Sequence, residues 1–88
     1  MGKHEKLYEH ILMRRSDANV PFDGLRSLVQ RLGFEERIKG DHHVFARAGV
    51  AEILNLQSKR GKAKPYQVKQ VREIILRYGL HLGESADD

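Results

Sequence analysis

Two adjacent histidines stand in the stretch GDHHVF (40–45), after a Gly-Asp pair and before a Val-Phe pair. Neighbouring imidazoles suggest a metal site, acid–base catalysis with a helper group, or two solvated side chains. The surrounding residues predict a β-strand from His42 to Arg47, preceded by a turn at Gly40 and Asp41. Because side chains alternate along a strand, we expect His42 and His43 on opposite faces.

Phe45 decides which face is which, because it is the largest apolar side chain of this strand. We expect it to point at the helices, which puts His43 on the core side near water and His42 on the open face. Diverging imidazoles cannot chelate one ion, and no nearby Asp, Glu and His repeat a ligand spacing, so neither a metal site nor a cofactor is predicted. An exposed His42 is suited to deprotonate a ribose 2′-hydroxyl, although spacing alone favours a histidine that is merely solvated.

A basic segment follows, SKRGKAKPYQVKQVR (58–72), with six Lys and Arg residues and no acid. Gly61 permits close approach to a phosphate backbone, and the helix start at Pro65 offers free N–H groups to an anion. An aromatic ring at that turn can stack on a base. An ordinary solvated loop is the alternative interpretation. The side chains predicted to bind RNA are Lys59, Arg60, Lys62, Lys64, Tyr66 and Lys69.

The elements that position these residues are predicted from hydrophobic spacing and turn residues. An amphipathic helix is expected over 5–15, and a second helix between Asp23 as N-cap and Gly33. A final helix is expected from Pro65 to Gly79. The short turns between the strands favour antiparallel pairing. The three strands are expected at 34–39, 42–47 and 52–57.

These elements predict the α+β class: a small three-stranded antiparallel sheet with helices on one face and the opposite face open to solvent. The 88-residue chain is expected to form a single domain over residues 1–83, followed by a disordered acidic tail, ESADD (84–88). The formal charge is +4, and the tail holds three acids and no base, so residues 1–83 carry +7. That excess favours a polyanionic partner.

Composition also narrows the class of protein. The chain has no cysteine, which excludes disulfide scaffolds and thiolate zinc sites. No apolar run approaches the roughly 20 residues that cross a bilayer. The N-terminus lacks the apolar stretch of a secretory signal. We therefore expect a cytoplasmic protein with no membrane partner.

Several motifs together resemble the HicA (YcfA-like) family, the mRNA interferase toxins of type II toxin–antitoxin systems. The residues that carry the resemblance are LGF (32–34), GDHHVF (40–45) and GKAKPYQVKQVREIIL (61–76). The similarity covers about residues 22–80, so the helix at 5–15 looks like an N-terminal extension. It implies a double-stranded-RNA-binding-domain-like fold of order α-β-β-β-α and metal-independent cleavage of mRNA. It also implies a HicB-like antitoxin that covers the sheet face.

The family's catalytic histidine follows a Gly-Ser pair, and that motif falls on Gly40 and Asp41 in this chain. The resemblance therefore indicates His42 as the acid or base, with His43 as the alternative. Asp41 departs from the family's serine. A carboxylate there would favour the charged form of the histidine, repel RNA phosphate locally, or orient the imidazole.

Three hypotheses follow from the sequence. The first is a metal-independent endoribonuclease toxin. The second is a non-catalytic RNA-binding module that uses the same basic surface, which the Asp41 departure favours. The third is a protein-interaction domain whose open sheet edge pairs with a partner strand.

Overall fold

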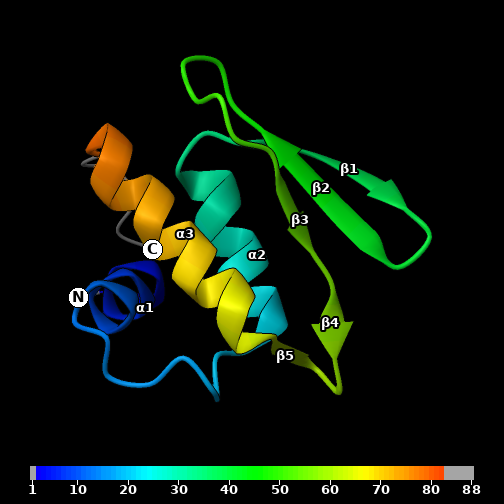
Figure 1. The fold of residues 1–88 in the computed structure, drawn as a ribbon. Coiled ribbons are helices and arrows are strands. Elements are labelled where there is room, and N and C mark those ends of the chain that lie inside the picture. Colours follow the sequence, from blue (N-terminus) through cyan, green and yellow to red (C-terminus); the bar gives the residue numbers. More distant parts are fainter. Residues whose placement is uncertain (1, 83–88) are drawn as a thin grey trace.

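A computed structural model describes residues 2–82, and its elements run helix, helix, three strands, hairpin, helix (Figure 1). The helices are α1 (Lys3–Leu12), α2 (Phe22–Arg31) and α3 (Pro65–Tyr78). The strands are β1 (Glu35–Lys39), β2 (His42–Ala46), β3 (Leu54–Leu56), β4 (Ser58–Lys59) and β5 (Lys62–Ala63). The predicted α+β class is confirmed. The predicted domain end at 83 and the tail at 84–88 lie outside the described residues.

Strands β1, β2 and β3 form one antiparallel sheet in that order, as the short turns predicted. In this sheet Phe45 pairs with Glu36 on one side and with Leu54 on the other. The turn between β1 and β2 consists of Gly40 and Asp41. Gly40 has φ +58° and Asp41 has no positive φ, as in a type II′ turn, where only the first central residue needs the left-handed region.

One face of the sheet is buried under the helices, and the other is open. Phe45, Leu54 and Leu56 are almost completely buried, whereas the side chains between them point to the exposed face. Figure 1 shows α2 and α3 on the same side of the sheet. The helices contribute to the same core through Ile11, Leu25, Leu28, Val29, Val68, Val71, Ile74 and Ile75. The predicted two-layer arrangement is therefore confirmed, and β3 lies next to α3.

The basic connection between β3 and α3 contains a small hairpin that the sequence pattern did not predict. Its strands β4 and β5 are joined by Arg60 and Gly61, which have φ values of +55° and +81°. Positive φ at both central residues is the pattern of a type I′ hairpin turn. Backbone bonds from Phe22 N to Gly61 O (3.0 Å) and from Ala63 N to Val20 O (2.9 Å) anchor the hairpin beside the start of α2.

Three helix ends differ from the prediction. Helix α1 begins at Lys3 rather than at Glu5. Helix α1 ends at Leu12 rather than near Arg15. Helix α2 begins at Phe22 with Pro21 as its N-cap, so the prediction of Asp23 as the cap is wrong. Asp23 lies in the first turn instead, where its negative charge suits the helix dipole. No helix within residues 2–82 is long and apolar enough to span a membrane.

The final helix keeps its predicted ends. It begins at Pro65 with Lys64 as N-cap, and Gly79 ends it in the left-handed conformation, φ +62°. The backbone N–H of Lys64 donates to Oε1 of Gln67 (3.3 Å), which satisfies a donor at the helix start.

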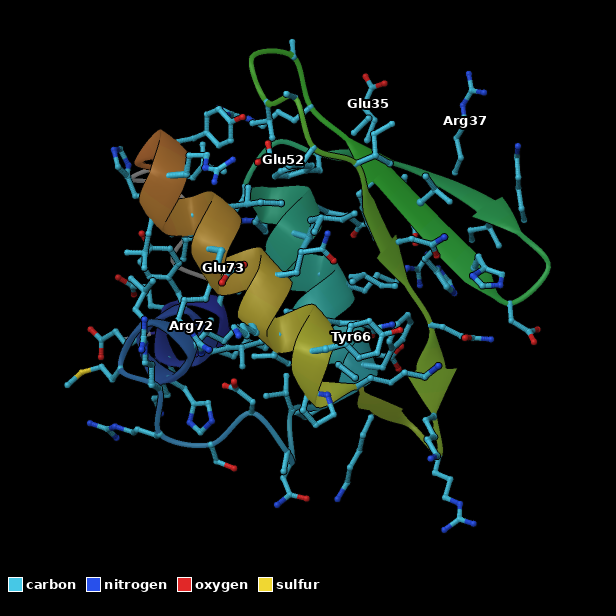
Figure 2. The ribbon with its side chains drawn as sticks, viewed as in Figure 1. Glu35, Arg37, Glu52, Tyr66, Arg72 and Glu73 are labelled. Atoms are coloured by element: carbon cyan, nitrogen blue, oxygen red, sulfur yellow. The ribbon has the colours of Figure 1, made fainter. Side chains whose placement is uncertain are left out.

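Arg72 of α3 fastens α1 to the rest of the fold. Its guanidinium is buried and donates to Oδ1 and Oδ2 of Asp17 (2.9 and 3.0 Å) and to the carbonyl of Ile11 (3.2 Å). Figure 2 shows Arg72 reaching from α3 toward α1. The hydrogen bonds from Arg72 lower the pKa of Asp17. Arg72 counted as a cation of the basic segment in the sequence, but its charge is used inside the protein.

The Asp17–Arg72 pair gives a first prediction. Asp17→Ala should lower the free energy of unfolding by about 3 kcal/mol, because it leaves a buried guanidinium without its counter-charge. The double variant Asp17→Ala/Arg72→Met should be more stable than Asp17→Ala alone, since the unpaired charge is then gone. Urea unfolding of wild type, Asp17→Ala, Arg72→Met and the double variant measures the coupling. Additive losses would contradict this account of the pair.

Candidate nucleic-acid interface

His42 lies at the start of β2 on the open face of the sheet, as strand alternation predicted. Its side chain is exposed, and Nδ1 lies 3.0 Å from Oδ1 of Asn55 on the neighbouring strand β3. Because an amide oxygen only accepts hydrogen bonds, Nδ1 carries the proton and donates. Nε2 of the neutral ring is then left with a lone pair, as a general base requires.

Asp41 is exposed in the turn before β2, and among the described residues no hydrogen bond joins its carboxylate to His42. The orienting role that the sequence suggested for Asp41 therefore belongs to Asn55. This residue was missed by motif reasoning, since it lies 13 positions away from the histidine. The alternation in ILNLQ (53–57) was the available signal, because it puts residues 53, 55 and 57 on the open face with His42.

A small hollow adjoins His42 between strand β3 and the first turns of α3. Its volume is about 250 Å³. We call it the His42 hollow. Tyr66, on the first turn of α3, is 63% exposed and forms part of its wall (Figure 2). The residues that line the hollow are His42, Ile53, Asn55, Gln57, Tyr66, Gln67 and Gln70.

A larger open groove, which we call the lysine groove, runs along the β4–β5 hairpin and has a volume of about 740 Å³. Four of the cations predicted to bind RNA line it: Lys59, Arg60, Lys62 and Lys64. Two of them are held at the groove by neutral partners. Lys62 Nζ donates to Oδ1 of Asn19 (2.8 Å), and Lys64 Nζ donates to Oε1 of Gln57 (3.0 Å). Their positive charges are therefore not neutralised by acids.

Tyr66 lines both the lysine groove and the His42 hollow. The structure thus places His42, Tyr66 and the four cations of the lysine groove around two concavities that share Tyr66. Lys69 is exposed on α3 but lines neither concavity. Gly40 and Asp41 form the turn before His42, outside both.

His43 faces the core side, as predicted, and has a different environment. Its Nδ1 lies 2.6 Å from Oε2 of Glu36, and its ring packs edge-on against Phe22 with centroids 4.9 Å apart. Glu36 also accepts hydrogen bonds from Arg26 (2.6 and 2.9 Å) and Gln30 (2.9 Å). Arg26 first, and then His43, lower the pKa of Glu36 to about 2. His43 is therefore positioned to join β1, β2 and α2 rather than to meet a ligand on the open face.

The ligands of a metal site do not converge anywhere in the part of the chain that the structure describes. Among residues 2–82, no three His, Asp or Glu side chains are grouped closely enough to hold an ion.

The Glu36 cluster predicts a pH-dependent stability. Glu36→Gln should lower the free energy of unfolding at pH 7 by about 2 to 3 kcal/mol, because the pKa of Glu36 falls from 4.5 to about 2 on folding. A depressed carboxyl pKa stabilises the fold above the unfolded value, and this contribution disappears as the pH falls from 4.5 through 2. The gap between wild type and variant should narrow over that window in urea unfolding. The exposed neighbour Glu35→Gln is the control, and a gap that stays constant with pH would refute the mechanism.

The Asn55–His42 hydrogen bond predicts the tautomer of the neutral ring. In ¹⁵N NMR spectra, His42 should carry its proton on Nδ1, because the oxygen of Asn55 accepts from that nitrogen. Asn55→Leu should remove this preference and shift the population toward the Nε2–H form. Asn55 is exposed, so the fold should survive the change. A His42 that remains an Nε2–H tautomer in wild type would contradict the assignment.

Comparisons with known proteins do not add to this geometry: no family model, no curated protein and no solved structure matches the chain.

Proposed function

We propose that this protein is a metal-independent endoribonuclease that cleaves mRNA, the toxin of a type II pair of the HicA (YcfA-like) kind. The observation that carries the proposal is the position of Tyr66, which lines both the lysine groove and the His42 hollow. An RNA backbone bound along the cations of the lysine groove then passes the ring of Tyr66 and reaches the imidazole of His42. Phosphate binding and acid–base chemistry therefore have one shared path.

The proposed reaction uses the nucleophile of the RNA itself. Nε2 of His42 accepts the proton of a ribose 2′-hydroxyl, and the 2′-oxygen attacks the adjacent phosphorus. The bond from phosphorus to the 5′-oxygen breaks, and that oxygen takes up a proton as it leaves. The products are a 2′,3′-cyclic phosphate and a 5′-hydroxyl. Lys64, held toward the hollow through Gln57, is placed to stabilise negative charge on the phosphate.

The order of elements supports the double-stranded-RNA-binding-domain-like assignment. Residues 22–78 run α2, β1, β2, β3, α3, with both helices on one face of the sheet. The β4–β5 hairpin is an addition within that order. Helix α1 is then the N-terminal extension, fastened by Arg72. On this proposal the protein acts in the cytoplasm, where mRNA is found.

A HicB-like antitoxin is the proposed protein partner. The open sheet face supports this, because its exposed side chains include Ile53, which is 60% exposed beside His42 in the same hollow. A partner that covers this face would bury the apolar side chain and block the imidazole at once.

A non-catalytic RNA-binding module is the second candidate, and Asp41 favours it. Its exposed carboxylate precedes His42 directly, where the family has a serine, and it adds negative charge next to the phosphate that would react. The lysine groove would still bind RNA in that case, with the salt sensitivity of phosphate contacts.

The decisive measurement is RNA cleavage in the presence of EDTA. Wild type should cleave, and His42→Ala should reduce the rate at least about 100-fold, because general acid–base catalysis contributes that much or more. Expression of wild type, but not of the variant, should arrest growth. His81→Ala is the matched control, since this histidine is exposed after α3 and lines neither concavity. Equal cleavage by His42→Ala would refute the role of the residue, and salt-sensitive binding without cleavage by wild type would support the second candidate.

A further inference from the structure

We propose that the His42 hollow is a nucleobase subsite that stacks one unpaired RNA base on Tyr66 and prefers a base edge rich in acceptor oxygens, such as that of uracil or guanine. The inference rests on the proposed function for the identity of the polymer as RNA. It goes further in naming the side chains that select a base. These are Tyr66 for stacking, and Asn55 and Gln57 for the edge.

The first observation is that two large and exposed side chains lie among the polar residues of the His42 hollow. Ile53 and Tyr66 are 60% and 63% exposed, and both line the same hollow, Ile53 from the residue just before β3 and Tyr66 from α3. Large apolar side chains left in water are suited to cover the flat face of a base, and an aromatic ring accepts any base by stacking. Tyr66 also lines the lysine groove, so a strand bound there has its next base at this ring.

The second observation is the orientation of the amides that line the hollow. Oε1 of Gln57 accepts from the ammonium of Lys64 (3.0 Å), and a lysine ammonium is a donor only. The oxygen of this amide is therefore engaged, and its NH₂ group remains available. Asn55 is in the same situation, because its Oδ1 accepts from His42 (3.0 Å).

Gln67 also has an engaged oxygen, since its Oε1 accepts from the backbone N–H of Lys64 (3.3 Å), but its side chain is buried and does not offer its NH₂ group to a ligand. Lys64 thus engages two glutamine oxygens, one through its ammonium and one through its backbone. The amides with an engaged oxygen that face the hollow are therefore those of Asn55 and Gln57, whose unbonded N–H groups outnumber the lone pairs left on their oxygens. A ligand edge that offers acceptors is the complementary partner.

This donor-rich wall discriminates among bases. Uracil presents O2 and O4, and guanine presents O6 and N7, whereas adenine places an amino group on its edge that would meet NH₂ groups. In a duplex the base faces are stacked and the pairing edges are occupied, so only an unpaired base can enter. The subsite therefore selects single-stranded RNA and, within it, the base next to the reacting phosphate.

The test measures binding without cleavage. Short 2′-O-methyl oligonucleotides lack the 2′-hydroxyl nucleophile, so wild-type protein can be titrated with fluorescent oligo-uridine and oligo-adenosine by anisotropy. Tyr66→Leu should weaken the binding of oligo-uridine about 5- to 150-fold, and Tyr66→Phe, which keeps the ring, should bind as wild type does. Because the side chain is exposed, neither change should unfold the protein.

The variant Gln57→Glu tests the preference for a base edge that offers hydrogen-bond acceptors. The carboxylate can keep one oxygen on Lys64 while the second oxygen replaces the NH₂ group. The ratio of affinities, oligo-uridine over oligo-adenosine, should fall about fivefold or more relative to wild type. Using the ratio removes the general loss caused by the added negative charge and the self-stacking of adenosine strands. Lys59→Ala/Arg60→Ala is the matched control, which should weaken both oligonucleotides equally and leave the ratio unchanged.

Three results would overturn the subsite: equal binding by Tyr66→Leu and Tyr66→Phe, an unchanged ratio in Gln57→Glu, or no binding of any oligonucleotide, which would leave the hollow to a protein partner. The proposed function fails separately. Base-dependent binding by a wild type that cleaves no unmodified RNA would retain the subsite and reject the nuclease. Cleavage that is insensitive to the Tyr66 variants would reject the subsite alone.

Discussion

The sheet of this protein can be covered on one face only, and most other features depend on that constraint. A chain of this size has a thin core, and α2 and α3 bury the face of Phe45, Leu54 and Leu56 while α1 packs against these two helices. The side chains between these positions must then face water. Because these side chains do not pack in the core, their residue types can suit binding or catalysis. The His42 hollow and the open face around it are consequences of this one-sided burial.

The same constraint gives two neighbouring histidines different surroundings. His43 points to the covered face and needs a polar partner there, which Glu36 supplies at 2.6 Å together with the contacts of Arg26. This network also holds β1 against β2, because Glu36 belongs to β1 and His43 to β2. His42 points to the open face and is held by a hydrogen bond to Asn55. The part-buried cluster around Glu36 supports the pairing of β1 with β2, whereas the bond between His42 and Asn55 joins β2 to β3.

Sequence patterns predicted the parts of this arrangement that are local. Alternation along one strand was sufficient to separate His42 from His43, and Pro65 and Gly79 marked the ends of α3 because their backbone preferences act within a turn or two. The β4–β5 hairpin was not predicted, because a strand of two residues is too short to show an alternation of apolar and polar side chains. Its Arg-Gly turn was the only local trace.

Long-range pairings were beyond such patterns. Arg72 looked like part of a basic surface because its acidic partner, Asp17, is 55 positions away and a helical face turns it toward α1. Asn55 and Gln57 were not predicted as site residues, because they are polar residues of an expected strand that carries no motif. Their meaning depends on the strand register and on the packing of β3 beside α3, which no single segment specifies.

Lys64 connects the fold to the candidate site. Its backbone N–H bonds to Gln67 at the start of α3, and its ammonium bonds to Gln57 at the end of the open sheet face. The residue that starts the helix therefore also orients the wall of the hollow and brings positive charge to it. Asp41 lies in the turn before β2, where only Gly40 requires a special backbone conformation. A serine and an aspartate fit that turn equally well, so the backbone of the turn does not determine which of the two stands at residue 41.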